Sequence, residues 1–253
     1  MLDRMLNRIA LLVFLCVAPS GAWAVPVYQL DIAGGFYDGV GESIVTDATR
    51  FTLFAYARPR NVTEFTSLLT RPSSLSIAIG SPGGASAGDL GSFRVNGELV
   101  RATADMRFGV PPYEPDGSVA TDPGDLASHG LGETWFVQKD FFFESARQSA
   151  IYDTALHAGS GPRAGTGMLY SAFAFDLGGL APGVSLHFDL YSTRLKNGDI
   201  DILAFAPFSH DAGTIARGVR PVPEPTAALV FGIGCLAIAL GHGSRAGVRA
   251  RTV

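Results

Sequence analysis

The chain has 253 residues, 47% of them hydrophobic and 17% charged, with a formal net charge of −4 at pH 7. This length is enough for one domain with a sizeable core. The segment from residue 25 to residue 220 carries 14 lysines and arginines against 21 aspartates and glutamates. That acidic balance argues against nucleic acid and anionic lipid as partners, and it is compatible with calcium.

Residues 1–24 have the pattern of a secretory signal peptide. Arg4 and Arg8 flank the start of an apolar stretch, residues 9–18, and Ala22-Trp23-Ala24 has the small-x-small form of a cleavage site. We therefore expect export by the Sec route and cleavage by signal peptidase after Ala24.

The segment 25–212 is expected to form an all-β domain. Polar and apolar residues alternate most clearly over 184–191, where Leu186, Phe188 and Leu190 would share one face of a strand. Gly, Pro, Ser and Asp fall in nearly every gap between such runs. A β-sandwich fits this pattern, with a jelly roll as one candidate form. The predicted strands cover 27–32, 51–56, 75–79, 93–95, 99–104, 134–143, 168–177, 184–191 and 200–205.

Connecting segments and boundaries follow from the same pattern. Short helices are expected over 62–70 and 147–157, long loops over 111–130 and 159–167, and a stalk over 213–221. Both cysteines, Cys16 and Cys235, lie outside the predicted domain. The domain is therefore expected to fold without a disulfide, although an exported protein could form one.

One loop offers a candidate metal site. Asp116, Asp122 and Asp125 lie within 111–130, with His129 close behind them. Oxygen-rich loops can bind calcium outside cells, but this spacing is not that of an EF-hand, and a solvated, turn-rich loop is the more common explanation of such residues. Structural calcium is the one cofactor that the sequence suggests.

Aromatic residues are dense around Trp135 and over 141–143. Because neighbouring residues of a strand face opposite sides, burial on both sides of a sheet would account for them. A sugar-stacking platform that includes Trp135 is the functional alternative.

Catalytic constellations are not evident in the sequence, and we predict that the protein is not an enzyme. Residues 84–88 match the G-x-S-x-G nucleophile elbow, but no strand leads directly into them and no helical pattern follows. His210 and Asp211 are adjacent, so on an extended chain they would point to opposite faces. A structural role, such as anchoring the C-terminal segment, is expected for this pair.

Residues 222–253 have three parts that together form a sorting tag. Val222-Pro223-Glu224-Pro225 is a short motif that its prolines keep extended. A transmembrane helix is predicted over 226–242; its uncharged part, 227–241, would span roughly 22 Å. That span is short for a hydrocarbon core of about 30 Å, but local thinning of the bilayer can absorb the difference.

A basic tail, 243–253, completes the tag, and its arginines are expected to stay cytoplasmic. They are Arg245, Arg249 and Arg251. Motif, helix and basic end together resemble the PEP-CTERM signal. In that family the signal is recognised by an exosortase, which is a membrane-embedded, transpeptidase-like enzyme. The hosts are Gram-negative bacteria that make exopolysaccharide. The resemblance implies a precursor in the inner membrane and a mature protein at the cell surface or in the extracellular matrix.

The domain that precedes this tag resembles the choice-of-anchor N family. The resemblance rests on Phe36-Tyr37-Asp38, on His129-Gly130 leading into Trp135-Phe136, and on the closing run from Phe205 to Ala212. It implies an exported surface protein of unassigned molecular activity, and it implies no catalytic residues.

The sequence therefore predicts an exported, exosortase-sorted surface or matrix protein that acts without catalysis, in or on extracellular polysaccharide. The alternative is a carbohydrate-binding or glycan-active β-sandwich module. An exposed Trp135, or two carboxylates about 5 to 9.5 Å apart in a cleft, would favour that alternative.

Overall fold

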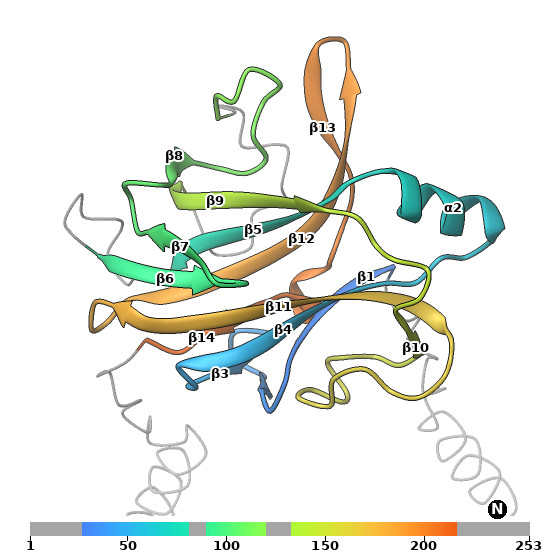
Figure 1. Ribbon diagram of the computed structural model, residues 1–253, viewed down its shortest axis with the longest axis horizontal. Coiled ribbons are helices and arrows are strands. Elements are labelled where there is room, and N and C mark those ends of the chain that lie inside the picture. The colour runs from blue at the N-terminus through green and yellow to red at the C-terminus, as the bar shows by residue number, and fades with distance from the viewer. Residues whose placement is uncertain (1–26, 81–89, 120–132, 217–253) are drawn as a thin grey trace, which may run out of the picture. The chain divides into compact units, whose positions relative to one another are not determined.

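Two β-sheets dominate the computed structural model of the chain, which describes residues 27–80, 90–119 and 133–216 (Figure 1). Within these residues one α-helix and one short 3-10 helix accompany the strands. The prediction of an all-β, sandwich-like domain is confirmed for this part of the chain. The signal peptide and the residues of the sorting tag lie outside the described residues.

The first sheet has six strands in the order β1-β4-β11-β6-β7, with β10 pairing beside β11. Every pair in it is antiparallel. Its strands are β1 (Tyr28–Ile32), β4 (Arg50–Ala57), β6 (Gly91–Val95), β7 (Glu98–Arg101), β10 (Gln148–Ala150) and β11 (Gly167–Leu180).

The second sheet has eight strands in the order β2-β3-β14-β12-β5-β9-β8, with β13 pairing beside β12. Strands β14 and β3 run parallel, and the other pairs are antiparallel. Its strands are β2 (Phe36–Asp38), β3 (Ser43–Thr46), β5 (Ser73–Gly80), β8 (Arg107–Gly109), β9 (Thr134–Phe141), β12 (Ser185–Lys196), β13 (Asp199–Phe205) and β14 (Ala212–Thr214).

The core lies between the two sheets and draws side chains from both. Phe175 of β11 stacks on Phe51 of β4 with ring centroids 5.2 Å apart, and Phe188 of β12 packs 4.9 Å from Phe175. Phe188 is fully buried, as the period-two pattern of its strand predicts. Aromatic rings from facing strands therefore tie the first sheet to the second.

Helix α2 (Val62–Thr70) confirms the helix predicted over 62–70. Asn61 caps it by accepting a hydrogen bond from the Glu64 backbone N–H, 2.9 Å away. Glu64 in turn pairs with Arg60, which precedes the helix. The sequence thus contains its own start signal for this element.

The helix predicted over 147–157 is wrong. Residues Gln148–Ala150 form β10 and pair with β11, and turns follow them. The Gln29 side chain holds the next residues extended, since it donates to the Tyr152 carbonyl and accepts from the Thr154 N–H. These tertiary hydrogen bonds use backbone groups that a helix would need for itself.

Two further boundaries differ from the expected ones. Strand β14 includes Gly213 and Thr214, which the sequence predicts as part of a stalk, and the Ile215 N–H donates to the Thr46 carbonyl. The small residues of β14 show no apolar alternation that would mark a strand. Strand β7 ends at Arg101, and turns occupy the remainder of the predicted 99–104 strand.

We expect Phe188→Ala to lower the free energy of unfolding by about 3–5 kcal/mol, because it empties a fully buried site between the sheets. Leu195→Ala on the same strand is the control, because Leu195 is 65% exposed and its truncation should change stability by less than about 0.5 kcal/mol. Denaturant unfolding of both variants measures the difference. Equal losses of stability in the two variants would contradict the placement of Phe188 in the core.

Candidate functional site

Strand β12 presents different chemistry on its two faces. Leu186, Phe188 and Leu190 point into the core, whereas His187 and Asp189 lie on the opposite face of the sheet. The neighbouring strand β5 aligns Ala78 with His187 and Ser76 with Asp189. The outer face of the second sheet is therefore polar along its centre.

Asp211 reaches this face from the end of the described chain. It follows the 3-10 helix η1 (Phe208–His210) and directly precedes β14. Strand β14 pairs with β12 so that Gly213 lies opposite His187, and Asp211 is two residues before Gly213 on the same face. This register brings the Asp211 carboxylate beside Asp189.

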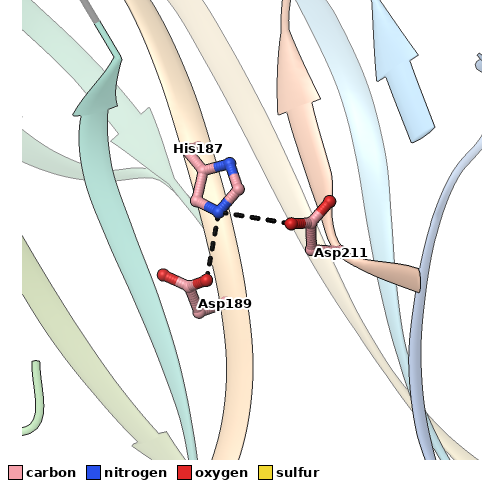
Figure 2. Close-up of side chains that lie close together, drawn as sticks. All are labelled: His187, Asp189 and Asp211. Atoms are coloured by element: carbon pink, nitrogen blue, oxygen red, sulfur yellow. Dashed lines mark hydrogen bonds and ion pairs between the residues drawn. The ribbon is translucent and has the colours of Figure 1, made fainter. Parts of the chain in front are cut away.

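The three side chains converge on one point (Figure 2). His187 Nε2 lies 3.0 Å from Asp189 Oδ1 and 3.5 Å from Asp211 Oδ2. One possible ligand atom from each residue lies within 4.8 Å of those of the other two. The side chains of His187, Asp189 and Asp211 are 15%, 10% and 6% exposed. The cluster is therefore largely buried but still partly accessible to solvent.

A hydrogen-bonded polar strip continues from this cluster across β12, β5 and β9. Gln138 Oε1 accepts from the Tyr191 hydroxyl at 2.9 Å and from the Tyr113 N–H at 3.1 Å, and Gln138 Nε2 donates to Asp140. Ser74 Oγ also donates to Asp140, at 2.7 Å. These contacts secure the strands on which the cluster depends.

Ser76 differs from the hydrogen-bonded side chains of this strip. Its side chain is fully buried, and among the described residues its Oγ has no hydrogen-bond partner. Ser76 lies directly opposite Asp189 in the register of β5 and β12. A buried hydroxyl of this kind ordinarily points to a water or an ion near it.

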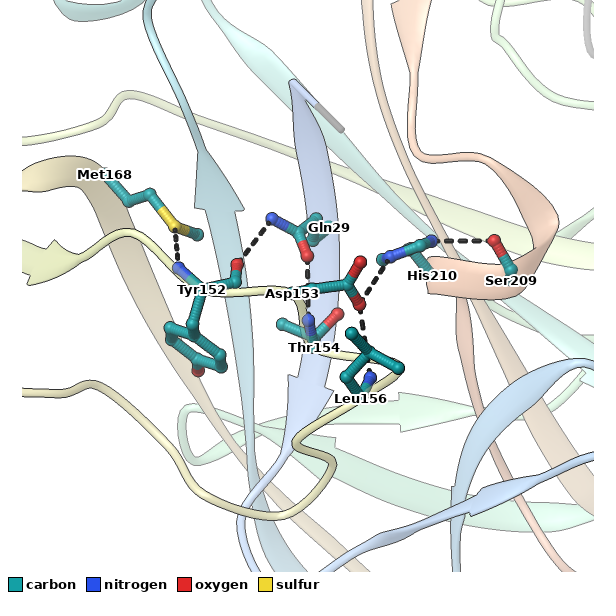
Figure 3. A network of polar contacts seen from close by, with 8 residues as sticks. All are labelled: Gln29, Tyr152, Asp153, Thr154, Leu156, Met168, Ser209 and His210. Carbon is teal, nitrogen blue, oxygen red and sulfur yellow. Dashed lines mark hydrogen bonds and ion pairs between the residues drawn. The ribbon is translucent and has the colours of Figure 1, made fainter. Parts of the chain in front are cut away.

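A second network fixes the segment that leads into Asp211 (Figure 3). His210 Nε2 lies 3.1 Å from Asp153 Oδ1, and Ser209 Oγ lies 2.7 Å from His210 Nδ1. Burial lowers the pKa of His210, although Asp153 opposes that effect. The neutral imidazole donates from Nε2 to Asp153 and accepts from Ser209.

The order Ser209, His210, Asp153 has the connectivity of a catalytic triad, but its geometry indicates a clamp. Asp153 Oδ1 also accepts the Leu156 N–H at 3.2 Å, and His210 and Asp153 are both buried. The pair therefore joins η1 to the segment after β10. This arrangement agrees with the structural role expected for His210, and it shows that His210 and Asp211 contact different partners.

The residues proposed from the sequence lie elsewhere. Asp116 is exposed and accepts the Ser118 N–H at 2.8 Å in a turn, and contacts with Ser118 lower its pKa. Asp122 and Asp125 lie outside the described residues. Trp135 is half-buried at the edge of the core, edge-to-face with Phe108 at 5.6 Å.

The cleavage and sorting residues also lie outside the described part of the chain. They are Ala22, Ala24, Val222, Pro223, Glu224, Pro225, Arg245, Arg249 and Arg251. Among the residues that the structure does describe, no helix has both the length and the apolar character to cross a bilayer. The transmembrane helix predicted over 226–242 is not among them.

One feature of the sequence points to this cluster. His187 and Asp189 are two residues apart in a predicted strand, so they had to share a face. Asp211 could not be added to them from sequence, because its position depends on the pairing of β14 with β12.

Comparison with known proteins gave no relatives: no family model, no curated protein and no solved structure matches this chain.

We expect Asp153→Ala to lower the free energy of unfolding by about 1–3 kcal/mol, because it leaves the buried His210 imidazole without its carboxylate partner and the Leu156 N–H without its acceptor. Asp153→Asn retains an acceptor oxygen and should lose less. The same loss of the clamp should shift the NMR resonances of the His187 imidazole, since Asp211 follows His210 directly. Asp116→Ala is the control, because it removes an exposed aspartate. If it lowers the free energy of unfolding as much as Asp153→Ala does, the contact between Asp153 and His210 does not stabilise the fold.

Proposed function

We propose that this chain is an exported surface or extracellular-matrix protein of a Gram-negative exopolysaccharide producer, sorted by an exosortase and acting without catalysis. The observation that carries the proposal is the order of three elements at 222–253. A Pro-Glu-Pro motif comes first, an uncharged apolar segment follows, and three arginines come last. Signal peptidase and the Sec machinery are the earlier partners, and extracellular polysaccharide is the later one.

The composition and packing of the described domain are compatible with a location outside the cell. Its stability rests on an apolar core shared by two sheets, and both cysteines of the chain lie outside the described residues. Its acidic balance favours solubility over contact with anionic polymers or lipid. These features are compatible with export, and the proposal itself rests on the two ends of the chain.

Replacement of Pro223-Glu224-Pro225 by three alanines should trap the precursor in the inner membrane, because the motif that the sorting enzyme reads would be lost. The measurement is fractionation of cells of the native host followed by immunoblotting for size and location. Replacement of Gly218-Val219-Arg220 by alanines is the matched control and should leave sorting intact. Arrival of the first variant at the surface at wild-type size would show that the motif is not a sorting signal.

A second candidate function is glycan binding, and one aromatic pair favours it. Phe108 of β8 is 47% exposed and lies edge-to-face with half-buried Trp135 of the adjacent strand β9. Exposed aromatic surface held by a neighbouring ring suits stacking against the apolar face of a sugar. The pair would then serve as the contact with extracellular polysaccharide.

For this second function, Phe108→Ala should weaken binding of the full-length chain to the host's own exopolysaccharide by roughly 2- to 10-fold in a pull-down titration. Phe142→Ala is the matched control, since Phe142 is 54% exposed and lies outside the pair. The titration is run with and without calcium. Binding that depends on calcium would indicate that the acidic loop containing Asp116 takes part. Equal binding by wild type and Phe108→Ala would remove the aromatic pair from consideration.

A further inference from the structure

We propose that His187, Asp189 and Asp211 bind one divalent transition-metal ion, with Zn²⁺ as the experimental probe, and that this ion fastens β14 to β12. Its role is structural. It is independent of the sorting signal and of the aromatic pair at Phe108.

The distances from the His187 nitrogen to the two carboxylate oxygens suit a coordination shell. Ligands about 2.0–2.1 Å from a metal ion lie about 3.3–3.4 Å apart in a tetrahedral site and about 2.9 Å apart in an octahedral one. His187 Nε2 lies 3.0 Å from Asp189 Oδ1 and 3.5 Å from Asp211 Oδ2. Both distances are within about 0.2 Å of the tetrahedral or the octahedral value, and the ligand atoms of the three residues lie within 4.8 Å of one another.

The charge and the donor types select the class of ion. The cluster offers one imidazole nitrogen and two carboxylate oxygens as possible ligands, and a divalent cation between them would offset the negative charge of the carboxylates. Burying two carboxylates together is costly unless a positive charge is near them. One nitrogen and two oxygen donors suit ions such as Zn²⁺ or Mn²⁺, whereas Ca²⁺ and Mg²⁺ prefer oxygen donors alone.

Ser76 supplies an independent observation at the same place. Its Oγ is fully buried and, in the part of the chain that the structure describes, has no hydrogen-bond partner. It lies on the same face as Asp189 and directly opposite it. A water that completes the coordination of the ion would give this hydroxyl its partner, as outer-shell groups commonly do at metal sites.

The ligands are held by strands on both sides, so the site needs no folding step of its own. His187 lies between Ala78 of β5 and Gly213 of β14, and the Asp211 carbonyl accepts the Ile44 N–H at 3.2 Å. Ligands fixed in this way lose little conformational entropy when the ion binds.

An ion pair is the competing account, since a protonated His187 could donate to both carboxylates at the same distances. The two accounts differ in what they require. The ion pair predicts no stoichiometric metal binding, whereas the metal site predicts one ion per chain.

The test uses the full-length chain, purified without a histidine tag and freed of metal by a chelator. We expect isothermal titration calorimetry to show one Zn²⁺ per chain. The unfolding midpoint should rise by about 5–10 °C at a free Zn²⁺ concentration about 100 times the dissociation constant. X-ray absorption of the loaded wild-type chain should show one imidazole nitrogen among oxygen ligands and no sulfur.

Matched variants locate the site. His187→Gln and Asp189→Asn should each abolish the Zn²⁺-dependent rise of the midpoint. His157→Gln and Asp116→Asn change the same residue types elsewhere and should retain the rise in full.

Three results would overturn the assignment. They are no stoichiometric Zn²⁺ binding by the wild type, a rise that survives in both His187→Gln and Asp189→Asn, and a bound ion whose absorption spectrum shows sulfur or lacks imidazole. If the variants fail to fold, the calorimetry and the absorption spectrum of the wild type decide the matter alone.

Discussion

The two faces of β12 are the constraint on which the rest of this domain depends. One face packs Phe188 against both Phe51 and Phe175, which joins the two sheets through a shared aromatic core. The other face holds His187 and Asp189 at the centre of a polar strip. Because the period of a strand is two residues, a shift of register by one residue would bury the charges and expose the core. The packing of the core therefore also sets the positions of His187 and Asp189 on the opposite face.

Buried carboxylates secure the long connections that cover the first sheet. Asp31 on β1 accepts the N–H groups of Gly159 and Gly161 at 2.7 and 3.0 Å, and Asp153 accepts from Leu156. Burial raises the pKa of Asp31, while its hydrogen-bond donors oppose the rise. Irregular chain of this kind needs side-chain acceptors for its backbone donors. Asp31 supplies them from a strand and Asp153 from the loop itself, so the conformation of this connection depends on the sheet as well as on its own sequence.

This dependence explains which features the sequence could predict. The strands with clear alternation were found because burial on one face leaves a local pattern, as in Leu186, Phe188 and Leu190. Helix α2 was predicted over 62–70, and the structure shows that Asn61 and Glu64 form a local start signal for it. The false helix over 147–157 and the missed strand β14 share a cause, since their backbone partners lie far away in the chain. Asp211 joined the candidate site through the same kind of long-range pairing, which a single sequence does not reveal.

The placement of β14 gives the cluster a physical consequence. This strand has three small, buried residues, Ala-Gly-Thr, and it pairs with β12 on one edge and with β3 on the other. Because its side chains supply little apolar surface, polar contacts contribute to its attachment to β12. Among them are the contact of Asp211 with His187 and the hydrogen bond from the Leu186 N–H to Thr214 Oγ1 at 2.8 Å. An ion that bridges β12 and the residue before β14 would add to these contacts, so amide exchange in β14 should slow when the ion binds.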